Sequence, residues 1–112
     1  MKTVLIILEA AALAAAAWAL PPPYTYVGKW GSLGSGNGQF SYPRGIAVVS
    51  NRNIYVVDSN NHRIQYFTLS GSFLGKWGSL GTGNGQFSYP RGIAVVSNGN
   101  IYVVDSNNHR IQ

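Results

Sequence analysis

The chain is a tandem repeat, and the repeat length is the strongest constraint on its fold. Residues 28–65 recur in order at 75–112, an offset of 47 positions, and 36 of the 38 residues are identical. The two differences are Ser35 against Thr82 and Arg52 against Gly99. Repeats of this size are stacked supersecondary units, none of which buries its apolar face alone. We therefore expect fold and function to belong to the array.

The N-terminal segment has the pattern of a secretory signal peptide. Lys2 supplies a positive charge, an apolar stretch runs on to Leu20, and Ala17 and Ala19 offer small residues for cleavage. We predict an apolar helical signal peptide over 1–19 and secretion of the remainder.

An uncleaved membrane anchor is the alternative, because the stretch approaches the roughly 20 apolar residues that span a bilayer. Glu9 argues against it, since a carboxylate near the middle of a spanning helix costs about 2.5–3.5 kcal/mol. Three prolines at 21–23 then break any helix. We assign 20–27 to a proline-rich linker that leads into a strand.

The part beyond residue 20 is basic and lacks cysteine. It carries seven lysines and arginines against two aspartates. Such an excess favours anionic partners, such as nucleic acid, acidic glycans or a lipid surface, although it also serves solubility. Without disulfides, the stability of an exported domain this small has to come from stacking.

The repeat itself is expected to be all-β. Short apolar runs at 46–49, 54–57, 62–67 and 73–77 are separated by turn residues, without helical periodicity. The first two runs are typical of inner strands buried on both faces. In the second copy, Asn98-Gly99 favours a type I′ hairpin turn.

Two stretches resemble a known family. GQFSYPRGIAV at 38–48 and NIYVVDSNNHRIQ at 53–65, both repeated, are similar to the NHL repeat. The resemblance covers nearly everything after Gly28. It implies β-propeller blades, each a four-stranded antiparallel sheet, with about two blades' worth over 28–74 and 75–112. Propellers of this family usually have five or six blades.

The strand order is permuted and incomplete. Residues 24–31 resemble 73–78, the outer strand of a blade, and Gln112 falls within a third strand. An open pair of blades leaves apolar faces and a sheet edge in water. Closure is expected from further repeats of a longer gene product, of which this is a fragment. The alternative is self-association, in which three copies complete a six-bladed ring.

We expect no catalytic site, metal or cofactor. The polar cluster from Asp58 to Arg63 is interpreted as a turn rather than a metal or acid–base site, because metal sites need three or four converging ligands. His62 is interpreted there as a structural group. The region after residue 20 has no glutamate, cysteine or phosphate-binding loop. The enzyme alternative, a six-bladed lyase or hydrolase, requires catalytic residues in further blades.

The resemblance instead implies a non-enzymatic binding scaffold. Its loop face would recognise an extracellular protein, peptide or glycan, or single-stranded RNA if the chain is not exported. A structural role is the alternative, in which Tyr42 and Pro43 pack at a blade edge and Arg44 pairs with Asp58 or Asp105. The candidate ligand-binding residues are Tyr42, Arg44, Asn61, His62, Tyr89, Arg91, Asn108 and His109.

Overall fold

The computed structural model describes residues 23–50 and 52–112, which form two antiparallel β-sheets. The first sheet has four strands in sequential order, each paired with the next. Apart from two single-turn 3₁₀ segments, η1 and η2, the described residues contain no helix, so the all-β prediction is confirmed. The strands of the first sheet are β1 (Pro43–Val48), β2 (Ile54–Asp58), β3 (Arg63–Phe67) and β4 (Phe73–Trp77).

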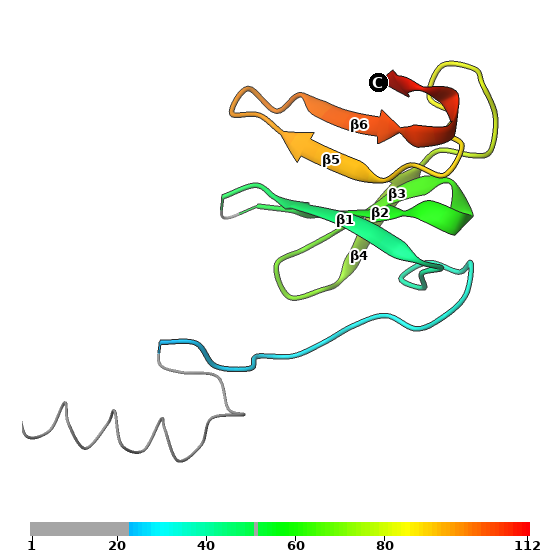
Figure 1. Cartoon of the computed structure of the whole chain (residues 1–112). Helices are drawn as coiled ribbons and strands as arrows, with labels where there is room; N and C mark the ends of the chain where they lie inside the picture. The colour runs from blue at the N-terminus through cyan, green and yellow to red at the C-terminus, as the bar shows by residue number, and fades with distance from the viewer. Residues whose placement is uncertain (1–22, 51) are drawn as a thin grey trace, which may run out of the picture.

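The second sheet repeats the first as far as the third strand. It consists of β5 (Gly92–Val95), β6 (Ile101–Asp105) and β7 (Arg110–Ile111), in sequential order. The 3₁₀ segments η1 (Ser59–Asn61) and η2 (Ser106–Asn108) join the second and third strands of the two sheets. Figure 1 shows the sheets stacked, with β5 running beside β1.

A continuous apolar cluster, here called the seam, joins the two sheets. Val57 and Ile64 of the first sheet are fully buried against Phe87 and Val103, which belong to the second repeat. Trp77 of β4 packs against this cluster, and so do other partly buried hydrophobic side chains of both sheets. The seam is therefore the shared core that makes two sheets into one stable unit.

The N-terminal predictions have different outcomes. The signal peptide over 1–19, its apolar helix and the first prolines lie outside the described residues, so they stay predictions. Residues 24–32 form no strand, although an outer strand was expected to begin there. A strand needs a hydrogen-bonded neighbour, and the described chain holds no preceding sheet. Within residues 23–50 and 52–112, no helix is long and apolar enough to cross a membrane.

The inner strand β1 differs from its sequence prediction. Burial on both faces was expected, yet Ile46 is 62% exposed and Val48 is 58% exposed. One face of β1 packs toward the second sheet, and nothing in the described chain covers the other face. Full burial of an inner strand therefore requires a sheet on each side.

The β5–β6 link is also not the predicted type I′ turn. The amide of Gly99 donates to the Val96 carbonyl at 2.8 Å, and Gly99 has a φ of 90°. Asn98 lacks the positive φ that type I′ requires of both central residues. Gly99 instead takes the left-handed position that follows the turn, as in longer hairpin loops.

Close packing at Gly45 generates a stability prediction. A Cβ at Gly45 would lie 2.7 Å from the Arg91 carbonyl oxygen across the seam, whereas one at Gly92 would meet only Val104 side-chain atoms, the nearest at 3.2 Å. Gly45→Ala should lower the free energy of unfolding by about 1–3 kcal/mol, the usual cost of overpacking. Gly92→Ala is the matched control and should cost less. Urea denaturation of both variants in dilute solution checks this, and equal losses would contradict it.

Candidate binding surface at the loop end

A buried carboxylate organises one end of the first sheet, here called the loop end. Oδ1 of Asp58 accepts a hydrogen bond from the Ser41 amide at 2.8 Å. Its Oδ2 accepts from Asn61 Nδ2 at 2.9 Å and from Arg63 Nε at 2.7 Å. Asp58 is completely buried. Removing a carboxylate from water costs free energy, and the charged and neutral hydrogen-bond donors around Asp58 offset that cost.

Arg63 and Gln65 extend this network to the preceding loop. The Arg63 guanidinium donates to the carbonyls of Ser35, Gly36 and Gln39 at 2.8–3.0 Å. Gln65 Nε2 donates to the Gln39 carbonyl at 2.6 Å. These side chains fix a glycine-rich loop that has little apolar packing of its own. We call Asp58, Asn61, Arg63 and Gln65 the clamp.

The second repeat builds the same clamp from Asp105, Asn108, Arg110 and Gln112. Desolvation raises the pKa of the fully buried Asp105 carboxyl. Hydrogen bonds from the Ser88 amide, Asn108, Arg110 and Gln112 outweigh this effect and hold the pKa below its ordinary value. The ionised carboxylate is therefore the form that the fold stabilises.

Two of the predicted ligand-binding residues are part of the clamp. Asn61 donates to Asp58 and to the Gly34 carbonyl, and Asn108 donates to Asp105 and to the Gly81 carbonyl. Both side chains are thus engaged in holding their own loop. The structural interpretation fits them better than ligand contact.

His62 and Tyr89 form a contact between the two repeats. Nδ1 of His62 accepts a hydrogen bond from the Tyr89 amide at 3.0 Å. Their rings meet edge to face, with centroids 4.5 Å apart. Both residues adopt a left-handed backbone, with φ of 53° and 49°. Such φ values are uncommon for residues other than glycine, and the equivalent Tyr42 and His109 share them.

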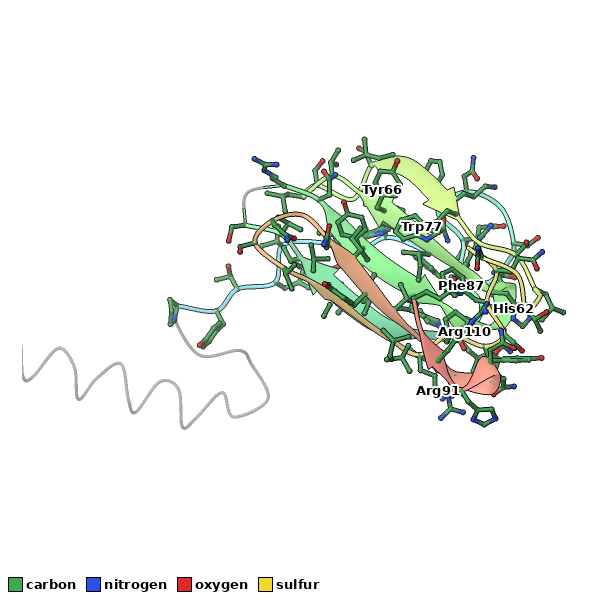
Figure 2. The ribbon with its side chains drawn as sticks, turned by 90° about the horizontal axis from the view of Figure 1, so that it is seen from above. His62, Tyr66, Trp77, Phe87, Arg91 and Arg110 are labelled. Carbon is green, nitrogen blue, oxygen red and sulfur yellow. The ribbon has the colours of Figure 1, made fainter. Side chains whose placement is uncertain are left out.

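The remaining predicted residues are exposed: Tyr42, Arg44, Arg91 and His109. Figure 2 shows Arg91 at the same end of the sheets as His62. The hypothesis that Arg44 pairs with Asp58 or Asp105 is wrong, because these carboxylates pair with Arg63 and Arg110 at 2.7 Å. Tyr42 has the same left-handed φ as Tyr89, at 52°.

The role of Arg63 and Gln65 was not predicted from the sequence. Both lie on β3 with alternating spacing, where an apolar inward face would be usual, and both are buried. That pattern, repeated at Arg110 and Gln112, was the available signal for a buried polar network. In the described part of the chain, no three histidine, cysteine or acidic side chains converge as metal ligands.

Comparisons with known proteins identify the repeat. The family model described as NHL repeat matches residues 40–67 and 87–112. The chain is similar to Protein brain tumor of Drosophila melanogaster, with 49% identity over 45 residues, which is 40% of this chain and 4% of that protein. B-box type zinc finger protein ncl-1 of Caenorhabditis elegans matches at 49% over 45 residues, or 40% of this chain and 5% of that protein. The chain thus spans only a small part of both relatives.

The clamp predicts a large effect from one substitution. Asp58→Asn removes the countercharge of Arg63, whose side chain is only 8% exposed, and should lower the free energy of unfolding by about 3–5 kcal/mol. Asp105→Asn is the matched control. Its loss should be smaller, because the Arg110 side chain is 30% exposed and remains partly hydrated. Urea titrations followed by tryptophan fluorescence would measure both losses, and a smaller loss for Asp58→Asn would refute the assignment.

The lowered pKa of Asp105 predicts acid sensitivity. Its contribution to stability is complete above the unfolded-state pKa near 3.8 and is lost as the pH falls through the lower pKa of the folded state. Urea midpoints measured from neutral pH down to about pH 2 should therefore decline in this acidic range. Asp105→Asn should show a shallower decline, and an unchanged profile would contradict the prediction.

Proposed function

We propose, because the chain belongs to the NHL-repeat family, that its two sheets are blades of a β-propeller acting as a non-enzymatic interaction module. The partner is an anionic segment of a protein, a peptide or a glycan, held at the loop end. Since the chain covers 4–5% of the relatives' length, this proposal concerns the repeat region alone.

The distribution of charge is the observation that carries the proposal. Both aspartates of the described chain are fully buried and paired with arginines. Among residues 23–50 and 52–112, the exposed charged side chains are therefore all cationic: Lys29, Arg44, Arg52, Lys76 and Arg91. A surface with one sign of charge attracts anionic partners and steers their approach.

The loop end offers suitable contact groups. Arg91 follows Tyr89 by two residues, and Arg44 follows Tyr42 in the same way. Arginine binds carboxylate or sulfate groups through a planar fork of donors, and tyrosine adds apolar area with a polar tip. The clamp holds the underlying loops without using these side chains, and Tyr42, Arg44 and Arg91 are exposed to a partner, while the Tyr89 ring also packs on His62.

Single-stranded RNA is a second candidate, because the same cations lie beside aromatic rings. Phosphate neutralisation together with base stacking is the usual basis of such binding. Secretion, predicted from residues 1–19, favours the protein, peptide or glycan alternative. An enzymatic role would need catalytic groups beyond the described residues, since the aspartates there serve the clamps.

Binding measurements with three anionic probes test the proposal: a glutamate-rich peptide, a sulfated glycan and single-stranded RNA. Arg91→Gln should weaken binding of the preferred probe about fivefold or more, the loss typical of a contact residue worth about 1 kcal/mol. Arg52→Gln is the matched control, because it removes one charge at the opposite, hairpin end and should change affinity less.

The outcomes separate the candidates. Preference for the peptide or the glycan supports the proposal, and preference for RNA supports the second candidate. Equal effects of Arg91→Gln and Arg52→Gln would show that net charge alone drives binding. Absence of binding to all three probes would reject the loop end as an anion-binding surface.

A further inference from the structure

A groove lies between the two hairpin turns, at the end of the sheets opposite the loop end. The β1–β2 turn and the β5–β6 turn both line it, and its volume is about 430 Å³. Figure 1 shows these two hairpins on the same side of the stacked sheets. The volume falls within the range of about 300–1,000 Å³ that is usual for small-molecule sites. We call this hollow the hairpin groove.

Matching hydrogen bonds hold the two turns that flank the groove. The amide of Arg52 donates to the Val49 carbonyl at 2.9 Å, and the amide of Gly99 donates to the Val96 carbonyl at 2.8 Å. A second backbone bond, at 3.0–3.1 Å, closes each hairpin. A ligand would thus meet turns that are already formed, which lowers the entropic cost of binding.

The groove contains a single charged side chain. Arg52 lines it from the first hairpin, and the equivalent position in the second hairpin is Gly99, where a Cβ would meet nothing within 4 Å. Both aspartates of the described chain are buried in the clamps, so neither pairs with Arg52. Identical hairpins would have placed two arginines here or none. One guanidinium suits one planar anionic group, such as a carboxylate.

Uncharged polar groups surround the guanidinium. Ser50 lines the groove from the first hairpin, and Ser97 and Asn98 line it from the second. Oδ1 of Asn98 accepts a hydrogen bond from the Asn100 amide at 2.9 Å, which commits the oxygen to the turn. The Nδ2 group of Asn98 and the two serine hydroxyls are hydrogen-bond donors that a carboxylate can accept from.

The rest of the wall is apolar. Val49 and Val95 are half-buried there, and Val96 is 40% exposed. We propose that the hairpin groove binds a small carboxylate with a short, branched aliphatic chain, the carboxylate on Arg52 and the chain on the valines. Removal of the chain and the valines from water adds to the charge attraction. This site shares no residue with the loop end, so it stands or falls independently of the proposed function.

Matched ligands test the two halves of the groove. Isocaproate carries both the charge and the branched chain, acetate carries the charge alone, and isocaproamide has the same shape without the charge. Nuclear magnetic resonance titrations of the isotope-labelled full chain should show that isocaproate shifts the amide signals of Ser97, Asn98 and Gly99. Acetate and isocaproamide should each bind about tenfold more weakly, because each lacks one of the two interactions.

Substitutions at position 52 test the role of the arginine. Arg52→Gln and Arg52→Gly should each raise the dissociation constant of isocaproate about tenfold or more, and should leave that of isocaproamide nearly unchanged. Arg52→Gly gives the first hairpin the residue of the second, which the fold already accommodates. Arg91→Gln is the matched control, because it removes the same charge at the loop end and should not alter isocaproate binding. Circular dichroism verifies that each variant is folded.

A tripeptide that ends in leucine presents the same carboxylate and branched chain. Tighter binding of this peptide than of isocaproate would identify a peptide terminus as the source of the ligand, and weaker binding would identify a free acid. Either order supports the site.

Four results would overturn the proposal. Absence of any isocaproate-dependent shift at 97–99 excludes the groove as a site. Isocaproate affinity that is unchanged in Arg52→Gln shows that the arginine does not hold the carboxylate. An equal loss in Arg91→Gln shows that net charge alone drives binding. Inorganic phosphate that binds as tightly as isocaproate shows that the valine wall contributes nothing.

Discussion

The buried pair of Asp58 and Arg63 is the interaction on which the rest of the structure depends. Each repeat holds a long, glycine-rich loop whose backbone carbonyls need donors, and the guanidinium provides them while its charge is balanced by the carboxylate. The same loop ends at Phe40, whose amide donates to the Ser32 carbonyl at 2.8 Å, so the pair acts together with the loop's own backbone hydrogen bonds. Buried charges are costly to desolvate, so such a network persists only when nearly every donor and acceptor is satisfied. The repeat satisfies this condition twice, with nearly identical distances.

Stacking provides the apolar half of the stability. One sheet buries its face only where another sheet meets it, as the contrast between Ile64 and Ile111 shows. The polar clamp and the apolar seam serve different purposes, because the clamp shapes a single repeat and the seam joins one repeat to the next. The loop end therefore presents exposed arginines and tyrosines in a repeating arrangement.

The sequence was sufficient for the strands, because their apolar runs and turn residues are local signals. The four strands of the first sheet and the shortened second sheet agree with that prediction. The exposure of β1 was not predictable from the run at 46–49, since burial of its second face depends on a sheet outside the described residues. The burial of Arg63 and Gln65 was not predicted either, because a polar residue on a strand is usually expected to face solvent. Of the eight candidate residues, Asn61 and Asn108 turned out to be loop supports, and the left-handed geometry joining His62 to Tyr89 could not be inferred from composition.

The longest-range hydrogen bonds of the clamp run toward the N-terminus, and this has a consequence for biosynthesis. Arg63 bonds carbonyls 24–28 positions earlier in the chain, and Gln65 reaches back 26 positions. Every partner has therefore left the ribosome before the third strand appears, and each repeat can close without waiting for later sequence. Each of these hydrogen bonds spans fewer positions than the 47-residue repeat, so a clamp needs no residue of the following repeat. A nascent chain of this kind can form its clamps one at a time in the order of translation, whereas the seam forms only after the following repeat has been made.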